Sequence, residues 1–250
     1  MKKVFLTSDM GCSKKENGIR CCTKINNENK IIEQIKESLD NENTFVFITS
    51  NPDDYKTNDN YANLTFNSFN ISGFDFKKLI IIDNRYLINL ENTIKNSDLI
   101  FLAGGNTEIE MNFFEKIKLR EILKNYNGVI IGQSAGAINL ANIAVCSPEY
   151  EEEIGKKYVW PGLEKTNINI EPHFHLETNT PLEEKLRKEL LSLSEKYNIY
   201  AIKDGTHIFD NGKEITLYGE AYLIKNKIIT KISDIGNNIS IKKQFNRLIK

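Results

Sequence analysis

The stretch that decides the fold spans residues 98–144, and its centre reads Gly132-Gln133-Ser134-Ala135-Gly136. An apolar run at 99–103 ends in Gly104-Gly105-Asn106-Thr107, and a second apolar run at 128–131 leads directly into the Gly-x-Ser-x-Gly sequence. Small residues follow the serine, and a helix-compatible segment runs from them to residue 145. Thr107 is expected to cap the helix that follows the first run. A strand, a sharp turn at a serine and a helix form the pattern of a nucleophile elbow, which lifts a serine hydroxyl clear of the sheet edge.

The same two turns predict where an oxyanion would be held. The N–H of Ala135 is expected to point at the developing charge, and a second N–H is expected from Gly105 in the neighbouring turn. We expect the residues around these donors to contact a substrate, namely Gly104, Asn106, Thr107 and Gln133.

Around this stretch, apolar runs alternate with helical patterns. Strands are expected at 2–8, 44–50 and 79–83, and helices at 30–39 and 87–96. The runs are continuous rather than alternating, as in parallel sheets covered on both faces. The sequence therefore predicts a doubly wound α/β fold with a mainly parallel sheet flanked by helices, in which function lies at the carboxyl ends of the strands.

The segments outside this pattern are read as loops or as a C-terminal β region. The segments 9–29 and 51–74 are polar, and whether either folds over the site stays open. A helix is expected from Pro181, and short strands follow it, with a hairpin turn at Asn211-Gly212. We expect residues 1–250 to form a single domain.

Composition excludes several classes of function. The net charge is -1, so nothing points to nucleic acid. No apolar run approaches the roughly 18 residues of a membrane span, so no membrane partner is expected. The first apolar run is short and ends at Asp9, which favours a strand over a signal peptide. Four cysteines without a CxxC pair predict a reducing, cytoplasmic location.

A serine nucleophile needs a base, and the chain has three histidines. His173 follows an extended segment and Pro172, which can hold its imidazole over a strand end. His175 would share the same face and is a competing candidate. His207 either lines the same site or begins the strand that follows it. We expect the two histidines other than the base, His175 and His207, to contact the substrate.

The base needs a carboxylate that holds it in the correct tautomer. The acidic residues between Ser134 and His173 supply candidates, and no single one is favoured by its position in the chain: Glu149, Glu151, Glu152 and Glu153.

Taken together, four segments resemble the serine peptidases of the class I glutamine-amidotransferase-like fold that include aspartyl dipeptidase (dipeptidase E) and cyanophycinase. The segments lie within about residues 99–225 in the family's order, and are Ala103-Gly104-Gly105-Asn106-Thr107, Gly132-Gln133-Ser134-Ala135-Gly136-Ala137, Ile170-Glu171-Pro172-His173-Phe174 and the acidic-Gly turn Ile202-Lys203-Asp204-Gly205-Thr206-His207-Ile208.

The resemblance implies that Ser134 is the nucleophile, that His173 is the base, and that Gly105 and Ala135 donate to the oxyanion. Dipeptidase-like spacing implies Glu149 as the acid, whereas cyanophycinase-like spacing implies Glu152; we favour Glu149 as the residue that orients His173. The resemblance further implies a small peptide substrate, with neither a metal nor an organic cofactor.

This sequence departs from dipeptidase E at residues 175–181, where no arginine is present for an aspartyl carboxylate. Lys185 and Arg187 lie farther on, and strict aspartyl-dipeptide specificity is not expected. The prediction is a serine peptidase acting on short peptides, as a monomer or homodimer. The alternatives are an esterase or amide hydrolase on a non-peptide substrate, and a catalytically inactive binding relative.

Overall fold

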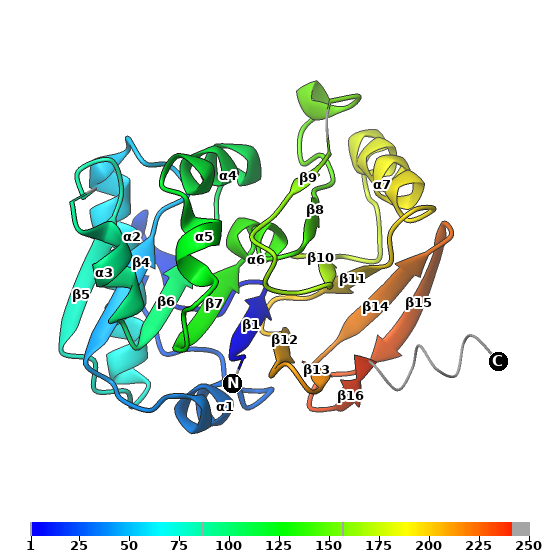
Figure 1. Ribbon diagram of the computed structural model, residues 1–250. Coiled ribbons are helices and arrows are strands. Elements are labelled where there is room, and N and C mark those ends of the chain that lie inside the picture. The colour runs from blue at the N-terminus through cyan, green and yellow to red at the C-terminus, as the bar shows by residue number, and fades with distance from the viewer. Residues whose placement is uncertain (1, 87, 157, 242–250) are drawn as a thin grey trace.

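The structure, a computed structural model, describes residues 2–86, 88–156 and 158–241 (Figure 1). Within these residues the central sheet has eight strands in the order β16-β13-β12-β1-β7-β6-β4-β5. Five neighbouring strands are parallel, namely β1 (Val4–Thr7), β7 (Val129–Gln133), β6 (Leu99–Leu102), β4 (Thr44–Ile48) and β5 (Lys78–Ile82). The remaining three add antiparallel pairings beyond β1, namely β12 (His207–Asp210), β13 (Ile215–Tyr218) and β16 (Asn238–Ser240).

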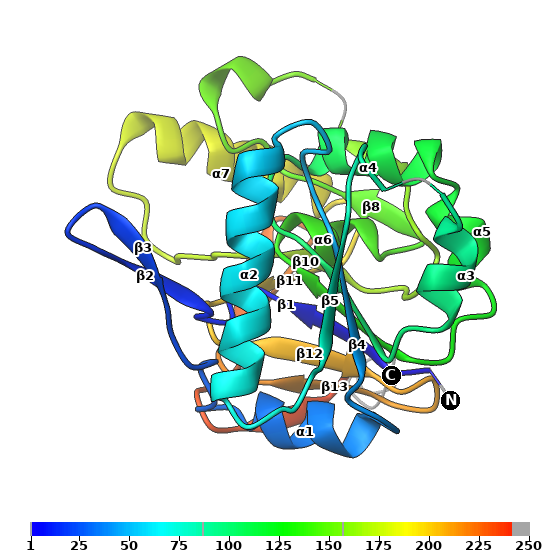
Figure 2. The ribbon, with the colours of Figure 1, turned by 90° about the vertical axis from the view of Figure 1, so that its left-hand side faces the viewer.

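Helices cover both faces of this sheet (Figure 2). One face packs against α1 (Ile31–Ser38) and α2 (Tyr55–Ile71). The other packs against α3 (Leu90–Lys95), α4 (Thr107–Lys116), α5 (Leu119–Leu123) and α6 (Ala135–Asn139). The expected α/β class with a mixed, mainly parallel sheet flanked by helices is confirmed.

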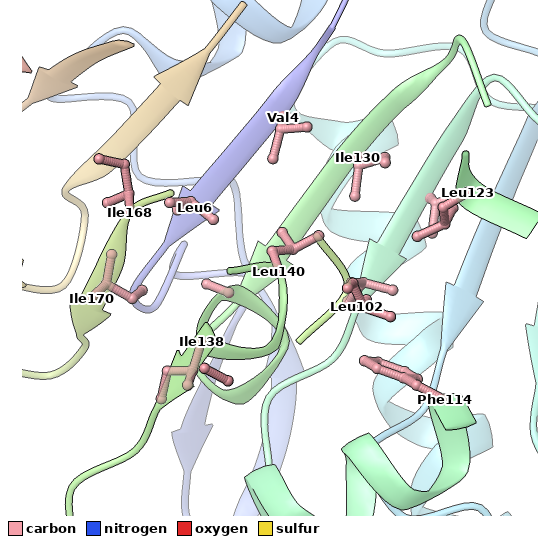
Figure 3. Close-up of a cluster of buried hydrophobic side chains, with 14 of the residues drawn as sticks. Val4, Leu6, Leu102, Phe114, Leu123, Ile130, Ile138, Leu140, Ile168 and Ile170 are labelled. Carbon is pink, nitrogen blue, oxygen red and sulfur yellow. The ribbon is translucent and has the colours of Figure 1, made fainter. Parts of the chain in front are cut away.

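The alternation of side chains along β4 shows why the strands read as continuous apolar runs. Phe45 and Phe47 belong to the cluster under α1 and α2. Val46 and Ile48 belong to the cluster on the opposite face, part of which Figure 3 shows. Because successive strand residues point to opposite faces and both faces are buried, no position along β4 favours a polar side chain.

A second sheet of four strands carries the other half of the site. Its order is β10-β11-β14-β15, with β10 (Asn169–Glu171) and β11 (Ile199–Ile202) parallel, and β14 (Ala221–Lys225) and β15 (Ile228–Ser233) antiparallel. The crossover from β10 to β11 includes α7 (Pro181–Leu193), which begins as expected at a proline, with Thr180 as its N-cap.

One buried cluster contains side chains from both sheets. Leu6 and Ile130 come from the central sheet, whereas Tyr200, Ile202 and Leu223 come from the second sheet. This shared core supports a single domain, which stays a prediction.

The two polar segments contain secondary structure that the sequence did not predict. Residues 9–29 were expected to form a long loop, which is wrong, and residues 51–74 could not be placed. Residues 9–29 include the hairpin of β2 (Ser13–Glu16) and β3 (Ile19–Cys22), joined through Asn17 and Gly18, both with positive φ. These strands are polar because the hairpin is largely exposed. Residues 51–74 contain α2, whose buried face includes Asn58 and Thr65, so its apolar periodicity is weak.

Two element boundaries also differ from expectation. The helix after Ser134 was expected to reach residue 145, but α6 ends at Asn139, and β8 (Ile143–Val145) then pairs with β9 (Val159–Pro161). Asn106 caps α4, because its side chain accepts a hydrogen bond from the N–H of Ile109, and Thr107 is the first helical residue.

In the described part of the chain, no helix combines the length and apolar character needed to cross a bilayer. The expected cytoplasmic location stays a prediction.

Candidate active site

Ser134 lies on the sharp turn between β7 and α6. Its φ of 51° and ψ of -112° are strained for a residue other than glycine. The glycines on either side permit a close approach of neighbouring backbone. A Cβ at Gly132 would lie 2.7 Å from Ala137 Cα, and a Cβ at Gly136 would lie 2.5 Å from the carbonyl oxygen of Leu102. The local geometry is that of a nucleophile elbow.

We expect Gly136→Ala to destabilise the protein by about 2–3 kcal/mol, because the added methyl group overlaps the backbone of β6, which cannot move without disturbing the sheet. Denaturant unfolding measures this loss. Gly155→Ala is the control: its Cβ would meet open space, so only its positive φ costs free energy, about 1 kcal/mol. A Gly136→Ala variant that is at least as stable as Gly155→Ala would contradict the close packing described here.

Two hydrogen bonds connect Ser134 to a histidine and an aspartate. The Nε2 of His173 lies 3.0 Å from Ser134 Oγ, and the Nδ1 of His173 lies 2.7 Å from Asp204 Oδ1. Ser134 follows β7 of the central sheet, whereas His173 follows β10 and Asp204 follows β11 of the second sheet. The three side chains therefore meet where the carboxyl ends of strands from both sheets converge.

The expectation that Glu149 contacts His173 Nδ1 is wrong, because Asp204 occupies that position. Glu149 lies in the same region, and its charge interacts with His173 without a hydrogen bond between them among the described contacts. Glu151 pairs with Lys185 at 2.8 Å, and Glu153 accepts the backbone N–H of Glu149 at 2.8 Å. Glu151, Glu152 and Glu153 form the short 3₁₀ helix η1, which is largely exposed.

Asp204 belongs to the acidic-Gly turn that carries part of the family resemblance, but the resemblance by itself implied no role for this aspartate. The signal that could have found it is its position after a strand. Residues 199–202 form β11, which is parallel to β10, so Asp204 and His173 leave neighbouring strands at the same edge.

The hydrogen bonds shift the pKa of both partners. Asp204 raises the pKa of His173 above its ordinary 6.5, because the carboxylate stabilises the imidazolium and outweighs the effect of burial. Burial alone would raise the pKa of Asp204, but hydrogen bonds from His173, Ser8 and the N–H of Asp9 hold it well below its usual range. Asp204 is therefore ionised at neutral pH and can hold the proton of His173 Nδ1.

The Gly104-Gly105 turn lies against the elbow, as expected. A Cβ at Gly104 would be 3.4 Å from the Cβ of Ser134. Gly105 has a φ of 151°, and a Cβ there would lie 2.1 Å from Ser50 Oγ, so the position requires glycine. The hydroxyl of Ser50 donates to the carbonyl oxygen of Gly104 at 2.7 Å and fixes the turn. Ala135 is the first residue of α6.

Two cavities flank His173. One of about 540 Å³ contains Ser134, and its lining includes Gly105, Asn106, Thr107, Glu149 and Trp160. The other, of about 400 Å³, is also lined by His173 and by residues that include Phe174, His175 and Arg187. The structure thus brings three of the expected substrate residues to the cavities (Asn106, Thr107 and His175), while Gln133 lines neither and lies beside Gly104.

Arg187 reaches the second cavity from α7. Its guanidinium stacks on Phe174 at 4.3 Å and donates from Nη2 to the carbonyl oxygen of His175. Its Nη1 is buried and has no hydrogen-bond partner within the described residues. Burial raises the pKa of Glu171, in the same cavity, to about 7, although the Ser147 hydroxyl donates to this carboxyl, with its Oγ 2.7 and 2.8 Å from the two oxygens.

His207 does not belong to the site. It is fully buried in β12, stacks on Tyr218 and has its Nε2 2.8 Å from Gln34 Oε1. Burial lowers its pKa to about 3, so it is neutral. The expectation that it contacts substrate is wrong because its strand begins after the Asp204 turn and carries the ring into the core.

A buried polar group connects the elbow helix to its surroundings. Asn139, at the end of α6, donates to Glu110 Oε2 and to the carbonyl oxygen of Thr107, both at 2.9 Å. Its side-chain oxygen accepts from Trp160 Nε1 at 3.0 Å. Burial raises the pKa of Glu110 well above its usual value. These contacts connect the beginning of α4, the elbow helix α6 and the cavity wall that contains Trp160.

The described residues contain no group of three or more histidine, cysteine, aspartate or glutamate side chains that could hold a metal ion.

Comparison with known proteins assigns the chain to a family. The family model described as Peptidase family S51 matches residues 22–218, which is more than half of the chain. The chain belongs to peptidase family S51. The expected relationship to aspartyl dipeptidase and cyanophycinase is thereby confirmed.

One curated relative and two solved structures are also similar to this chain. The uncharacterized peptidase Lmo0363 of Listeria monocytogenes is 30% identical over 129 residues, which cover 49% of this chain and 60% of that relative's length. A peptidase structure from an acI-B1 Actinobacterium has a TM-score of 0.66 at 15% identity, covering 96% of this chain and 97% of that one. A putative peptidase E structure from Listeria monocytogenes EGD-e has a TM-score of 0.58 at 19% identity, covering 93% and 100%. These two structures share the S51 chain's fold.

Proposed function

We propose that this S51 chain is a serine peptidase that hydrolyses short peptides through Ser134, His173 and Asp204. The observation that carries the proposal is the continuous hydrogen-bonded path from Ser134 Oγ through both nitrogens of His173 to Asp204. A serine hydroxyl becomes nucleophilic when a positioned base accepts its proton, and the base works best when a third group orients it.

In the proposed reaction, Ser134 Oγ attacks the peptide carbonyl carbon while its proton passes to His173 Nε2. Asp204 keeps the other proton of the imidazole on Nδ1 and stabilises the imidazolium. The N–H groups of Gly105 and Ala135 donate to the oxyanion. His173 then protonates the leaving amine, the C–N bond breaks, and an acyl-enzyme remains. Water attacks this ester with His173 as base, which releases the acid and restores Ser134.

The shape of the site supports a short substrate. The cavity that contains Ser134 is bounded on one side by the acidic segment at Glu149 and on another by Trp160 of β9. Cavities of several hundred Å³ bury most of a small ligand, and about 540 Å³ suits a few residues of peptide. The acidic residues Glu108, Glu149 and Glu153 line this cavity, and among the described lining residues one lysine, Lys156, faces them. We therefore expect peptides that place an acidic side chain in this cavity to be poor substrates, because like charges repel.

Active-site labelling tests the proposal directly. Incubation with a small fluorophosphonate is expected to add one label to the wild-type chain and none to Ser134→Ala, as intact mass spectrometry would record. A panel of dipeptides and tripeptides, compared with short acyl esters, then separates a peptidase from an esterase. An unlabelled but folded wild-type protein would contradict the proposed activation of Ser134.

A further inference from the structure

Ser8 is hydrogen-bonded to both His173 and Asp204, the two residues connected to Ser134. This residue follows β1 and is fully buried. Its hydroxyl donates to Asp204 Oδ1 at 2.6 Å and accepts the backbone N–H of His173 at 2.8 Å. A serine hydroxyl has one hydrogen and two acceptor positions, so both bonds form at once. Nδ1 of His173 is 3.3 Å from the same oxygen, but its proton has a better acceptor in Asp204 at 2.7 Å.

The bonds of Ser8 cross between the two sheets. β1 pairs with β7, which carries Ser134, so Ser8 and the nucleophile share the central sheet. His173 and Asp204 leave strands of the second sheet. The Ser8 side chain therefore ties both the base and the acid to the sheet that holds the nucleophile, and the N–H of the next residue, Asp9, adds a bond to Asp204 alone at 3.1 Å.

The backbone of His173 also requires such support. Its φ is 53°, in the left-handed region that residues other than glycine rarely adopt. The residue before it is Pro172, whose ring fixes its own φ and so restricts the backbone that leads into His173. The hydrogen bond from the His173 N–H to Ser8 holds this conformation, and with it the direction in which the imidazole leaves the backbone.

From these contacts we propose that Ser8 is a positioning residue of the active site, one that sets the orientation of His173 and Asp204 relative to Ser134. The inference deepens the proposed function and rests on it. Ser8 does not touch the reacting atoms, and it acts only through the two groups to which it is bonded. A displacement of about 1 Å in such a group is enough to lower a rate about 100-fold.

The test compares Ser8→Ala with Ser97→Ala. Ser97 is also a buried serine, and its hydroxyl donates to the carbonyl oxygen of Ile94 at 2.7 Å, before the amino end of β6 and away from the site. Ser8→Ala is expected to lower kcat on a peptide substrate about 10- to 100-fold with KM nearly unchanged, and to slow fluorophosphonate labelling equally. Ser97→Ala is expected to leave kcat and the labelling rate unchanged, even where it lowers thermal stability as much as Ser8→Ala does.

A measurement without turnover keeps the inference separate from the proposed function. The proton on His173 Nδ1 is held between the imidazole and Asp204, and its NMR resonance is expected in the wild type and in Ser97→Ala. In Ser8→Ala the ring is no longer fixed, so the resonance is expected to broaden or vanish through exchange with water. If Ser8→Ala does not fold, Ser8→Cys, which nearly keeps the side-chain volume, carries the same comparison.

The outcomes divide clearly. An active wild type whose Ser8→Ala variant keeps full kcat and a sharp Nδ1 proton overturns the role of Ser8. A wild-type protein that is neither labelled by the fluorophosphonate nor able to hydrolyse any peptide overturns the proposed function. In that case, a proton signal that is present in the wild type and lost in Ser8→Ala still supports the positioning contact.

Discussion

Ser134→Ala is expected to lower kcat/KM on a peptide substrate by about 10⁴- to 10⁶-fold, because the attacking oxygen is removed and only binding and the oxyanion donors remain. The fold is expected to persist. The turn at Ser134 is set by backbone contacts, including the bond from its N–H to the carbonyl oxygen of Thr7 at 2.9 Å, and these do not involve the hydroxyl. The free energy of unfolding should therefore change by less than about 1 kcal/mol.

Steady-state kinetics and denaturant unfolding on the same preparations measure the two effects. Ser97→Ala again serves as the matched control, since it removes a buried serine hydroxyl outside the site. Substantial activity in a purified Ser134→Ala protein would rule out Ser134 as the nucleophile.

Asp204→Asn should have the second largest effect, a loss of about 10⁴-fold in kcat, because an amide in this position no longer stabilises the imidazolium and allows the wrong tautomer. The pH profile should move as well. His173 acts as a base only when neutral, so activity falls as the pH drops through its pKa. That pKa lies above 6.5 in the wild type because of Asp204, so the acid limb of the residual activity should shift to lower pH in the variant.

The control for Asp204→Asn is Glu149→Gln. Glu149 lines the cavity and interacts with His173 only through its charge, so its loss is expected to change kcat less than about tenfold and to leave the acid limb nearly in place. A loss in Glu149→Gln as large as that in Asp204→Asn would return the acid role to the segment after the elbow.

Features that depend on neighbouring residues in the chain could be predicted from the sequence. The elbow is one, because a strand, a serine between two glycines and a helix are consecutive, and the close approach at Gly132 and Gly136 excludes larger side chains there. The buried strands are another, since a parallel sheet covered on both faces needs uninterrupted apolar runs. His173 was recognisable for a similar reason, as it follows an extended segment and a proline.

Features that depend on the order of strands in the sheets could not be read in this way. Ser8 is 196 positions from Asp204 and 165 from His173, yet one hydroxyl joins all three. Glu149 is near the elbow in sequence but faces a cavity, whereas Asp204 is distant and contacts His173 because β10 and β11 are neighbours. His207 follows Asp204 by three positions and is carried into the core by β12.

The sequence by itself thus predicted the class of fold, which is confirmed, together with the proposed nucleophile and base, because each is encoded in a short run of residues whose conformation depends mainly on that run. The proposed partner of the base and the proposed positioning residue emerged only from the tertiary structure. Hydrogen-bond partners are selected by distance in space, and the pairing of β1 with β7 and of β10 with β11 sets those distances.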